Sequence, residues 1–170
     1  ARYLQNTHGV DKIAIIDWDV HHGNGTQHLF EEDPSVLYIS THQYPFYPGT
    51  GSYSETGIGR GSGTTLNCPM PIGATDRDYD KVFMQAILPK LDNFKPEFIL
   101  ISAGFDAHQA DPLANINLST DSFVWMTERI MEKADHHCEN RIISLLEGGY
   151  NLQALPLCIG KHLETLLQHS

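Results

Sequence analysis

Acidic and imidazole side chains alternate directly after an apolar run near the start of the chain. Residues 13–16 are apolar and predict a buried strand. Asp17, Asp19 and His21 follow at every second position. Side chains two residues apart in an extended chain point to the same side. We therefore expect Asp19 and His21 to converge on one point, as the ligands of a divalent metal do.

A plainer explanation is that strands often end in polar residues, and a lone Asp-x-His pattern is usually a cap or a turn. Here three acceptor groups stand at one strand end. They would repel one another or lose hydration at a cost unless a cation or hydrogen-bond donors lay among them. The metal site is therefore the favoured interpretation.

Two later apolar segments lead into residues of the same kind. Residues 98–103 run into Asp106 and His108, and residues 142–146 run through two glycines to Tyr150. In open parallel sheets, ligands bind beyond the carboxyl ends of the strands. With Asp19 and His21, Asp106 completes a three-ligand site with a place open for water, for which zinc is the first candidate and iron or manganese the alternatives.

Tyr150 offers a hydroxyl at the same carboxyl ends of the predicted strands. Beside a metal it would donate a hydrogen bond to a developing oxyanion. Taken by itself, a tyrosine after a glycine turn is more often a core aromatic.

Strands and helices are expected to alternate along the chain, which favours a parallel sheet covered on both faces. The predicted fold class is a three-layer α/β/α arrangement with a mainly parallel sheet. The long segment 42–63 is expected to be an ordered loop, because it contains four aromatic residues. Strands are predicted at residues 13–18, 36–41, 64–68, 98–103 and 142–146, and helices at residues 25–30, 76–91, 120–138 and 152–167, after a first helix that ends near residue 6.

The bulk composition excludes some classes of function. The 170 residues carry a net charge of −10, which argues against a nucleic-acid surface. No apolar run is long enough to span a membrane. Cys68, Cys138 and Cys158 lie far apart, so three reduced thiols and a cytoplasmic location are expected.

Three segments together resemble the zinc-dependent histone deacetylase superfamily, which includes acetylpolyamine amidohydrolases and bacterial deacetylase-like amidohydrolases. The wording is closest to its class II-like branch. The resemblance implies an arginase/deacetylase-like fold and a hydrolase that removes acyl groups from lysine side chains or polyamines with a metal-activated water. The matching segments are residues 17–26, 102–108 with 111–113, and 146–151, supported by residues 47–51 and 61–67.

The same resemblance assigns roles to individual positions. It makes Asp19, His21 and Asp106 the Zn²⁺ ligands and Tyr150 the donor to the oxyanion. Asp17 matches a carboxylate that hydrogen-bonds a catalytic histidine, and Asn24 stands where some members carry a second such aspartate. The resemblance implies that Tyr47, Leu113 and Gly149 contact the substrate. It implies a monovalent-cation site, with K⁺ as the candidate, formed mostly by backbone oxygens of Asp17, Asp19, His21, Ser40 and Thr41. A second such site is implied at Phe30, Asp33 and Val36.

One departure from the family stands out. Its general acid and base is a pair of adjacent histidines on a loop that precedes this region, and no matching segment occurs in the 170 residues. His21 and His22 are not that pair, because His21 is committed to the metal, and residues 136–137 are expected on a surface helix. We expect residues 1–170 to be the C-terminal portion of a single catalytic domain whose N-terminal portion is absent. Exposed apolar surface and association, for example as a homo-oligomer, would follow.

Two alternatives stay open. An arginase-like dinuclear manganese hydrolase would need carboxylates where Gly23 and His108 stand, which disfavours it. The other alternative is a truncated, catalytically inactive metal-binding fragment or pseudoenzyme, and the missing histidine pair is the feature that would favour it.

Overall fold

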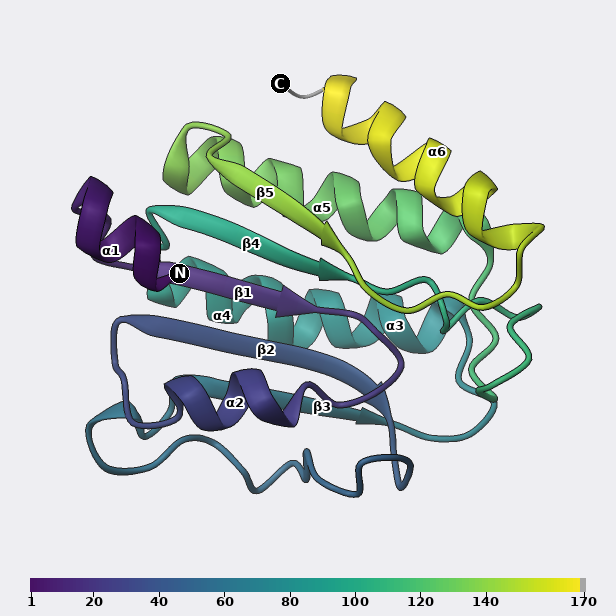
Figure 1. Ribbon diagram of the computed structural model, residues 1–170, viewed down its shortest axis with the longest axis horizontal. Helices are drawn as coiled ribbons and strands as arrows, with labels where there is room; N and C mark the ends of the chain where they lie inside the picture. Colours follow the sequence, from purple (N-terminus) through teal and green to yellow (C-terminus); the bar gives the residue numbers. More distant parts are fainter. Residues whose placement is uncertain (169–170) are drawn as a thin grey trace.

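The apolar segments form one sheet in which all five strands are parallel (Figure 1). The strand order is β3-β2-β1-β4-β5. The central strand β1 is buried along its whole length, because it has a neighbour on each side and side chains packed on both faces. The computed structural model describes residues 1–168, and its strands are β1 (Ile13–Asp17), β2 (Val36–Gln43), β3 (Thr65–Met70), β4 (Phe98–Ala103) and β5 (Ile142–Leu146).

Helices cover both faces of the sheet, as predicted for a three-layer α/β/α fold (Figure 1). Alternate residues of β1 pack against the helices on opposite faces of the sheet. Ala14 and Ile16 pack with the larger cluster, and Ile13 and Ile15 pack with the smaller one. The smaller cluster involves α1 (Arg2–His8) and α2 (Asn24–Phe30), and the larger involves α3 (Asp76–Val82), the π-helical segment η2 (Phe83–Ile87), α4 (Leu88–Phe94), α5 (Thr120–Cys138) and α6 (Ala154–Gln168).

The helix expected over residues 76–91 is divided into α3, η2 and α4. Pro89, in the first turn of α4, explains the interruption. Its nitrogen has no hydrogen to donate, and its ring crowds the carbonyl four residues earlier. A π-helical turn is one of the ways in which a helix accommodates such a break.

Strand β3 is longer than expected, because it continues through Pro69 to Met70. The prediction ended this strand at Cys68. A proline can remain in a strand at the edge of a sheet, where one side needs no hydrogen bonds. β3 occupies such an edge.

The other edge strand, β5, exposes apolar side chains. Ile143, Leu145 and Leu146 are 46%, 49% and 59% exposed. Ile143 lies opposite Leu100 of β4, which faces the α1 and α2 layer, and none of the helices in residues 1–168 buries it there. The expected exposed apolar surface is therefore present. No helix within residues 1–168 is long and apolar enough to cross a membrane.

Candidate metal centre

The chain turns immediately after β1, and this turn brings Asp19 and His21 together. The strand ends at Asp17, whose carboxylate accepts a hydrogen bond from the backbone N–H of Asp19 at 3.1 Å. Asp19 repeats the pattern by accepting from the backbone N–H of His21 at 2.8 Å. The two side chains therefore converge through successive Asp turns. The expectation that they would share one face of a continuing strand was wrong, since the side-chain acceptors draw the backbone out of the extended form.

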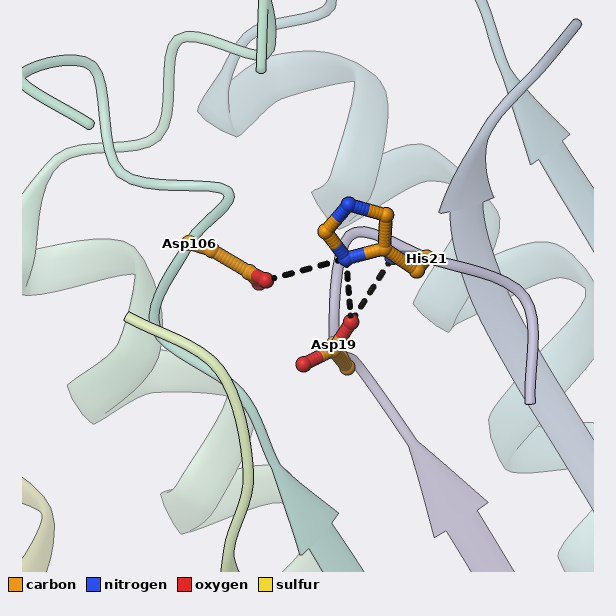
Figure 2. A group of neighbouring side chains, drawn as sticks. All are labelled: Asp19, His21 and Asp106. Carbon is orange, nitrogen blue, oxygen red and sulfur yellow. Dashed lines mark hydrogen bonds and ion pairs between the residues drawn. The ribbon is translucent and has the colours of Figure 1, made fainter. Parts of the chain in front are cut away.

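Asp106 reaches the same point from the loop after β4 (Figure 2). The Nδ1 atom of His21 lies 3.0 Å from Oδ1 of Asp19 and 3.2 Å from Oδ2 of Asp106. One ligand atom from each residue lies within 4.8 Å of the other two. Two carboxylates and one imidazole from two strand ends thus surround one small volume.

Backbone amides hold both carboxylates in place. Oδ1 of Asp106 accepts from the N–H of Val20, and Oδ2 of Asp19 accepts from the N–H of Gly148, each at 2.8 Å. These two bonds join the loops that follow β1, β4 and β5. The ligand oxygens therefore have fixed positions, as a metal site requires.

One carboxylate oxygen in the cluster is left over. Oδ2 of Asp106 is buried and has no hydrogen-bond partner among residues 1–168, apart from its ion-pair contact with His21. A buried acceptor without a partner is costly, and a cation among these three groups would remove that cost. This observation and the donor types fit a divalent metal such as zinc.

The pKa shifts report the same crowding of charge. Burial raises the pKa of Asp106, and the carboxylates of Asp106 and Asp19 raise the pKa of His21 to about 10. Although burial opposes ionisation of Asp19, hydrogen bonds from His21 and from the backbone hold its pKa below the usual value. Burial, with the charge of Asp19, raises the pKa of Asp17 to about 8. A positive charge at the centre of the cluster is therefore strongly favoured.

Tyr150 lines the same cleft as Asp19 and His21 of the cluster. The cleft has a volume of about 420 Å³, and its lining includes Asp19, His21, Gly148 and Tyr150. Tyr150 is 49% exposed. Burial and the charges of Asp106 and Asp19 raise its pKa, so its hydroxyl stays protonated and can donate a hydrogen bond.

Comparison with known proteins identifies the family. The model of the histone deacetylase domain matches residues 1–166. The chain belongs to the histone deacetylase family. It is 47% identical to "Histone deacetylase 14, chloroplastic" of Arabidopsis thaliana, over 98% of the chain and 40% of that protein. It is 48% identical to a "Probable deacetylase" of Archaeoglobus fulgidus, over 87% of the chain and 42% of that protein.

Solved structures agree with the sequence match. The crystal structure of the HDA15 HD domain superimposes with a TM-score of 0.90 at 39% identity, over 98% of this chain and 47% of that one. The histone deacetylase Clr3 also gives a TM-score of 0.90, at 38% identity, over 98% of this chain and 28% of that one. The chain therefore has the fold of the histone deacetylase domain, and it spans less than half the length of these relatives.

Two of the three residues expected to contact the substrate, Tyr47 and Leu113, lie on loops. Tyr47 is 76% exposed, and its ring meets the ring of His21 edge-on at 6.2 Å. Leu113 is 53% exposed, and its N–H donates to Asp111 at 2.9 Å. The other oxygen of Asp111 accepts from the N–H of Tyr150 at 2.8 Å. Asp111 thus joins the Leu113 and Tyr150 loops.

Gly149, the third expected substrate position, holds the chain in the turn before Tyr150. Its φ of 146° is one that residues with a side chain rarely adopt. Asn24, which was expected near a catalytic histidine, lies outside the cleft. It is exposed at the start of α2 and is not among the residues that line the cleft.

The residues expected at the first monovalent-cation site are neighbours in the sheet. Asp17 of β1 lies opposite Ser40 of β2 in the register, and Thr41 follows. Both β2 residues are buried, and the Ser40 hydroxyl is hydrogen-bonded to the ring of His42 at 2.9 Å. Their role as cation ligands stays a prediction.

The residues expected at the second cation site form a turn. The N–H of Asp33 donates to the carbonyl of Phe30 at 2.9 Å, and the N–H of Val36 donates to the carbonyl of Asp33 at 3.3 Å. The Arg2 guanidinium pairs with the Asp33 carboxylate and lies 4.7 Å from the centre of the Phe30 ring. A bound cation would compete with this arginine.

Some residues that shape the site were missed by sequence reasoning. The Phe46 ring stacks on His21 at 5.4 Å, and Glu147 lines the cleft with a pKa raised by burial and by the charges of Asp19 and Asp106. Their places in the sequence could have pointed to the site, because Phe46 directly precedes Tyr47 and Glu147 directly precedes the two glycines. The role of Asp111 could have been suspected from its place in the matching segment 111–113.

Replacing Gly148 should weaken metal binding. A Cβ atom at Gly148 would overlap Oδ2 of Asp106 and lie 2.6 Å from Oδ2 of Asp19. We expect Gly148→Ala to lower zinc affinity by at least about tenfold, because the carboxylates must move. Competition with a chromophoric chelator measures this in the full-length protein. Gly25→Ala is the matched control, since its Cβ meets nothing within 4 Å; equal affinities of the two variants would contradict the prediction.

Proposed function

We propose that the protein is a zinc-dependent deacetylase that hydrolyses the amide bond of an acyl-lysine side chain or an acylpolyamine. The observation that carries the proposal is the convergence of Asp19, His21 and Asp106, two of which, Asp19 and His21, line one cleft together with Tyr150. Family membership supports the reaction class. One relative is named "Probable deacetylase", and another, from Pseudomonas aeruginosa, is named "Histone deacetylase-like amidohydrolase". The first name gives no substrate, and the second refers to histone deacetylases and to amide hydrolysis in general.

Each residue of the cleft has a task in this reaction. A zinc ion bound by the three ligands would polarise the substrate carbonyl and bring the pKa of a bound water toward neutrality. The Tyr150 hydroxyl donates a hydrogen bond to the carbonyl oxygen as negative charge develops on it. The carboxylate of Asp17 accepts hydrogen bonds from the N–H of Asp19 and the hydroxyl of Tyr38, and in this proposal it would also accept one from a catalytic histidine outside these 170 residues.

The substrate class follows from the loops beside the cluster. Phe46 and Tyr47 place aromatic rings against His21, and Leu113 adds an apolar side chain on a loop tied to Tyr150. These side chains suit a slim, flexible acyl chain. The net charge of −10 favours approach of a cationic lysine peptide or polyamine, but it does not separate the two.

The remaining assignments are proposals of the same kind. K⁺ at the Asp17, Ser40 and Thr41 site would stabilise the end of β1, and the turn of Phe30, Asp33 and Val36 is the second candidate site. No nucleic-acid partner is proposed, and a homo-oligomer stays a prediction. A cytoplasmic location is also a prediction, and two relatives carry chloroplastic names.

An inactive metal-binding module is the second candidate function for these 170 residues. One observation favours it. Both ring nitrogens of His22 are hydrogen-bonded, to Thr50 at 2.7 Å and to Gln27 at 2.8 Å. His108 likewise contacts the N–H of Ala110 and the hydroxyl of Thr120. Neither histidine is free to act on a water at the cluster.

Metal content tests the ligand set. We expect about one zinc ion per chain in the full-length protein and its loss in Asp106→Asn, because the amide cannot replace the carboxylate charge. Elemental analysis of the purified proteins measures this. Asp92→Asn, a partly exposed carboxylate on α4, is the control. A stoichiometry near two, or an unchanged metal content in Asp106→Asn, would refute the mononuclear site.

The role of Tyr150 is tested by removing one oxygen atom. In the full-length protein, Tyr150→Phe should lower kcat on an acetyl-lysine peptide by about 10²–10³-fold with little change in KM, since the hydroxyl matters chiefly as charge develops. Tyr53→Phe is the control, because Tyr53 is exposed on the loop and does not line the cleft. An unchanged kcat would leave Tyr150 with a packing role.

The two candidate functions are separated by comparing the 170-residue chain with the full-length protein. With zinc supplied to both, we expect the short chain to hydrolyse acetyl-lysine and acetylpolyamine substrates at least about 10²-fold more slowly, because a positioned general base contributes about 10²–10⁴-fold. Comparable rates would mean that a base lies within these residues. Glu147→Gln would then test the carboxylate that lines the cleft.

A further inference from the structure

A buried histidine lies behind the candidate metal centre and has no part in the proposed reaction. His162 of α6 is 3% exposed. Its Nδ1 atom lies 2.7 Å from the hydroxyl of Thr127 on α5, and its Nε2 atom lies 2.9 Å from the hydroxyl of Ser144 on β5. The ring therefore joins two helices and a strand by hydrogen bonds.

The direction of these bonds can be worked out. The Thr127 hydroxyl donates to the carbonyl of Phe123 at 2.6 Å, so it must accept from Nδ1–H of His162. Nε2 is then the unprotonated nitrogen, and the Ser144 hydroxyl donates to it. Burial lowers the pKa of His162 to about 4, which agrees with a neutral ring at pH 7. One tautomer satisfies all three groups.

The same ring packs against the two strand ends that carry the metal ligands. It meets Trp18 edge-on at 5.7 Å and Phe105 at 5.8 Å. Trp18 lies between Asp17 and Asp19, and Phe105 directly precedes Asp106. Both aromatic side chains are buried, so a shift of one is transmitted to its neighbours.

We propose that His162 is a positioning residue for the metal centre and the Tyr150 loop. Its ring fixes Trp18 and Phe105 relative to each other, and its hydrogen bond to Ser144 ties β5, which leads to Gly148 and Tyr150, to the same support. The inference rests on the proposed deacetylase function for its effect on turnover. Its effect on zinc affinity can be measured without turnover.

Three substitutions separate the parts of this role. His162→Phe keeps an aromatic ring against Trp18 and Phe105 but loses both hydrogen bonds. His162→Ala loses the packing as well. His162→Gln can donate to Thr127 and accept from Ser144, so it is the conservative replacement.

The experiment measures kcat, KM and zinc affinity of these variants in the full-length protein. We expect His162→Phe and Ser144→Ala to lower kcat by about tenfold with KM and zinc affinity changed by less than about twofold, because the Tyr150 loop loses its tie. His162→Ala should also weaken zinc binding by about tenfold. His162→Gln should recover most of kcat.

A matched control separates positioning from general stability. Thr165→Val removes a buried hydroxyl of α6 that, within residues 1–168, donates to the Lys161 carbonyl of its own helix. It should leave kcat and zinc affinity unchanged at a comparable loss of unfolding free energy. If kcat instead follows stability across all variants, or if Ser144→Ala and His162→Phe keep wild-type kcat, the proposal is overturned. A wild-type protein without deacetylase activity refutes the proposed function, and unchanged zinc affinity in His162→Ala then refutes this inference separately.

Discussion

The carboxylates of Asp19 and Asp106 repel each other, yet both must be held beside the imidazole ring of His21. The arrangement of three loops depends on the hydrogen bonds that hold them there. Asp106 is anchored by the N–H of Val20, and Asp19 by the N–H of Gly148. Each bond stabilises a negative charge and also joins two strand ends. The electrostatic requirement of the site and the mechanical connection of the loops are therefore met by the same contacts.

This constraint explains why glycines border the ligands. A Cβ atom at Gly104 would lie 2.6 Å from Oδ2 of Asp19, and one at Gly148 would be equally close to the same atom. The backbone N–H of Gly148 must approach Asp19 to donate to it, and Gly104 packs directly against Asp19, so a side chain at either position would prevent the approach. The parallel sheet makes the approach possible, because it delivers the carboxyl ends of β1, β4 and β5 to one edge.

Local sequence patterns correctly predicted the bounds of those strands and helices that long-range contacts do not change. The strands at residues 98–103 and 142–146 were placed correctly, as was the helix from Thr120 to Cys138. Pro89 divided the expected helix through a backbone effect that the apolar stripe conceals. The residues of the candidate metal centre could be singled out because their types and spacing are unusual. The hydrogen bond between His162 and Thr127 could not be predicted, since the two residues are 35 positions apart in the chain.

β5, the strand that leads to Tyr150, is also the least protected strand of the sheet. β5 has a neighbour on one side alone within the described sheet, and three of its five side chains are exposed, whereas β1 is buried throughout. Amide protons of β5 can therefore exchange with solvent through local opening, at a free energy below that of global unfolding. The residue proposed to recognise the transition state, Tyr150, thus follows closely on a strand of low local stability. Any surface that pairs with or covers β5 also suppresses this opening, and the order of the active site is thereby coupled to contacts made at the far side of that strand.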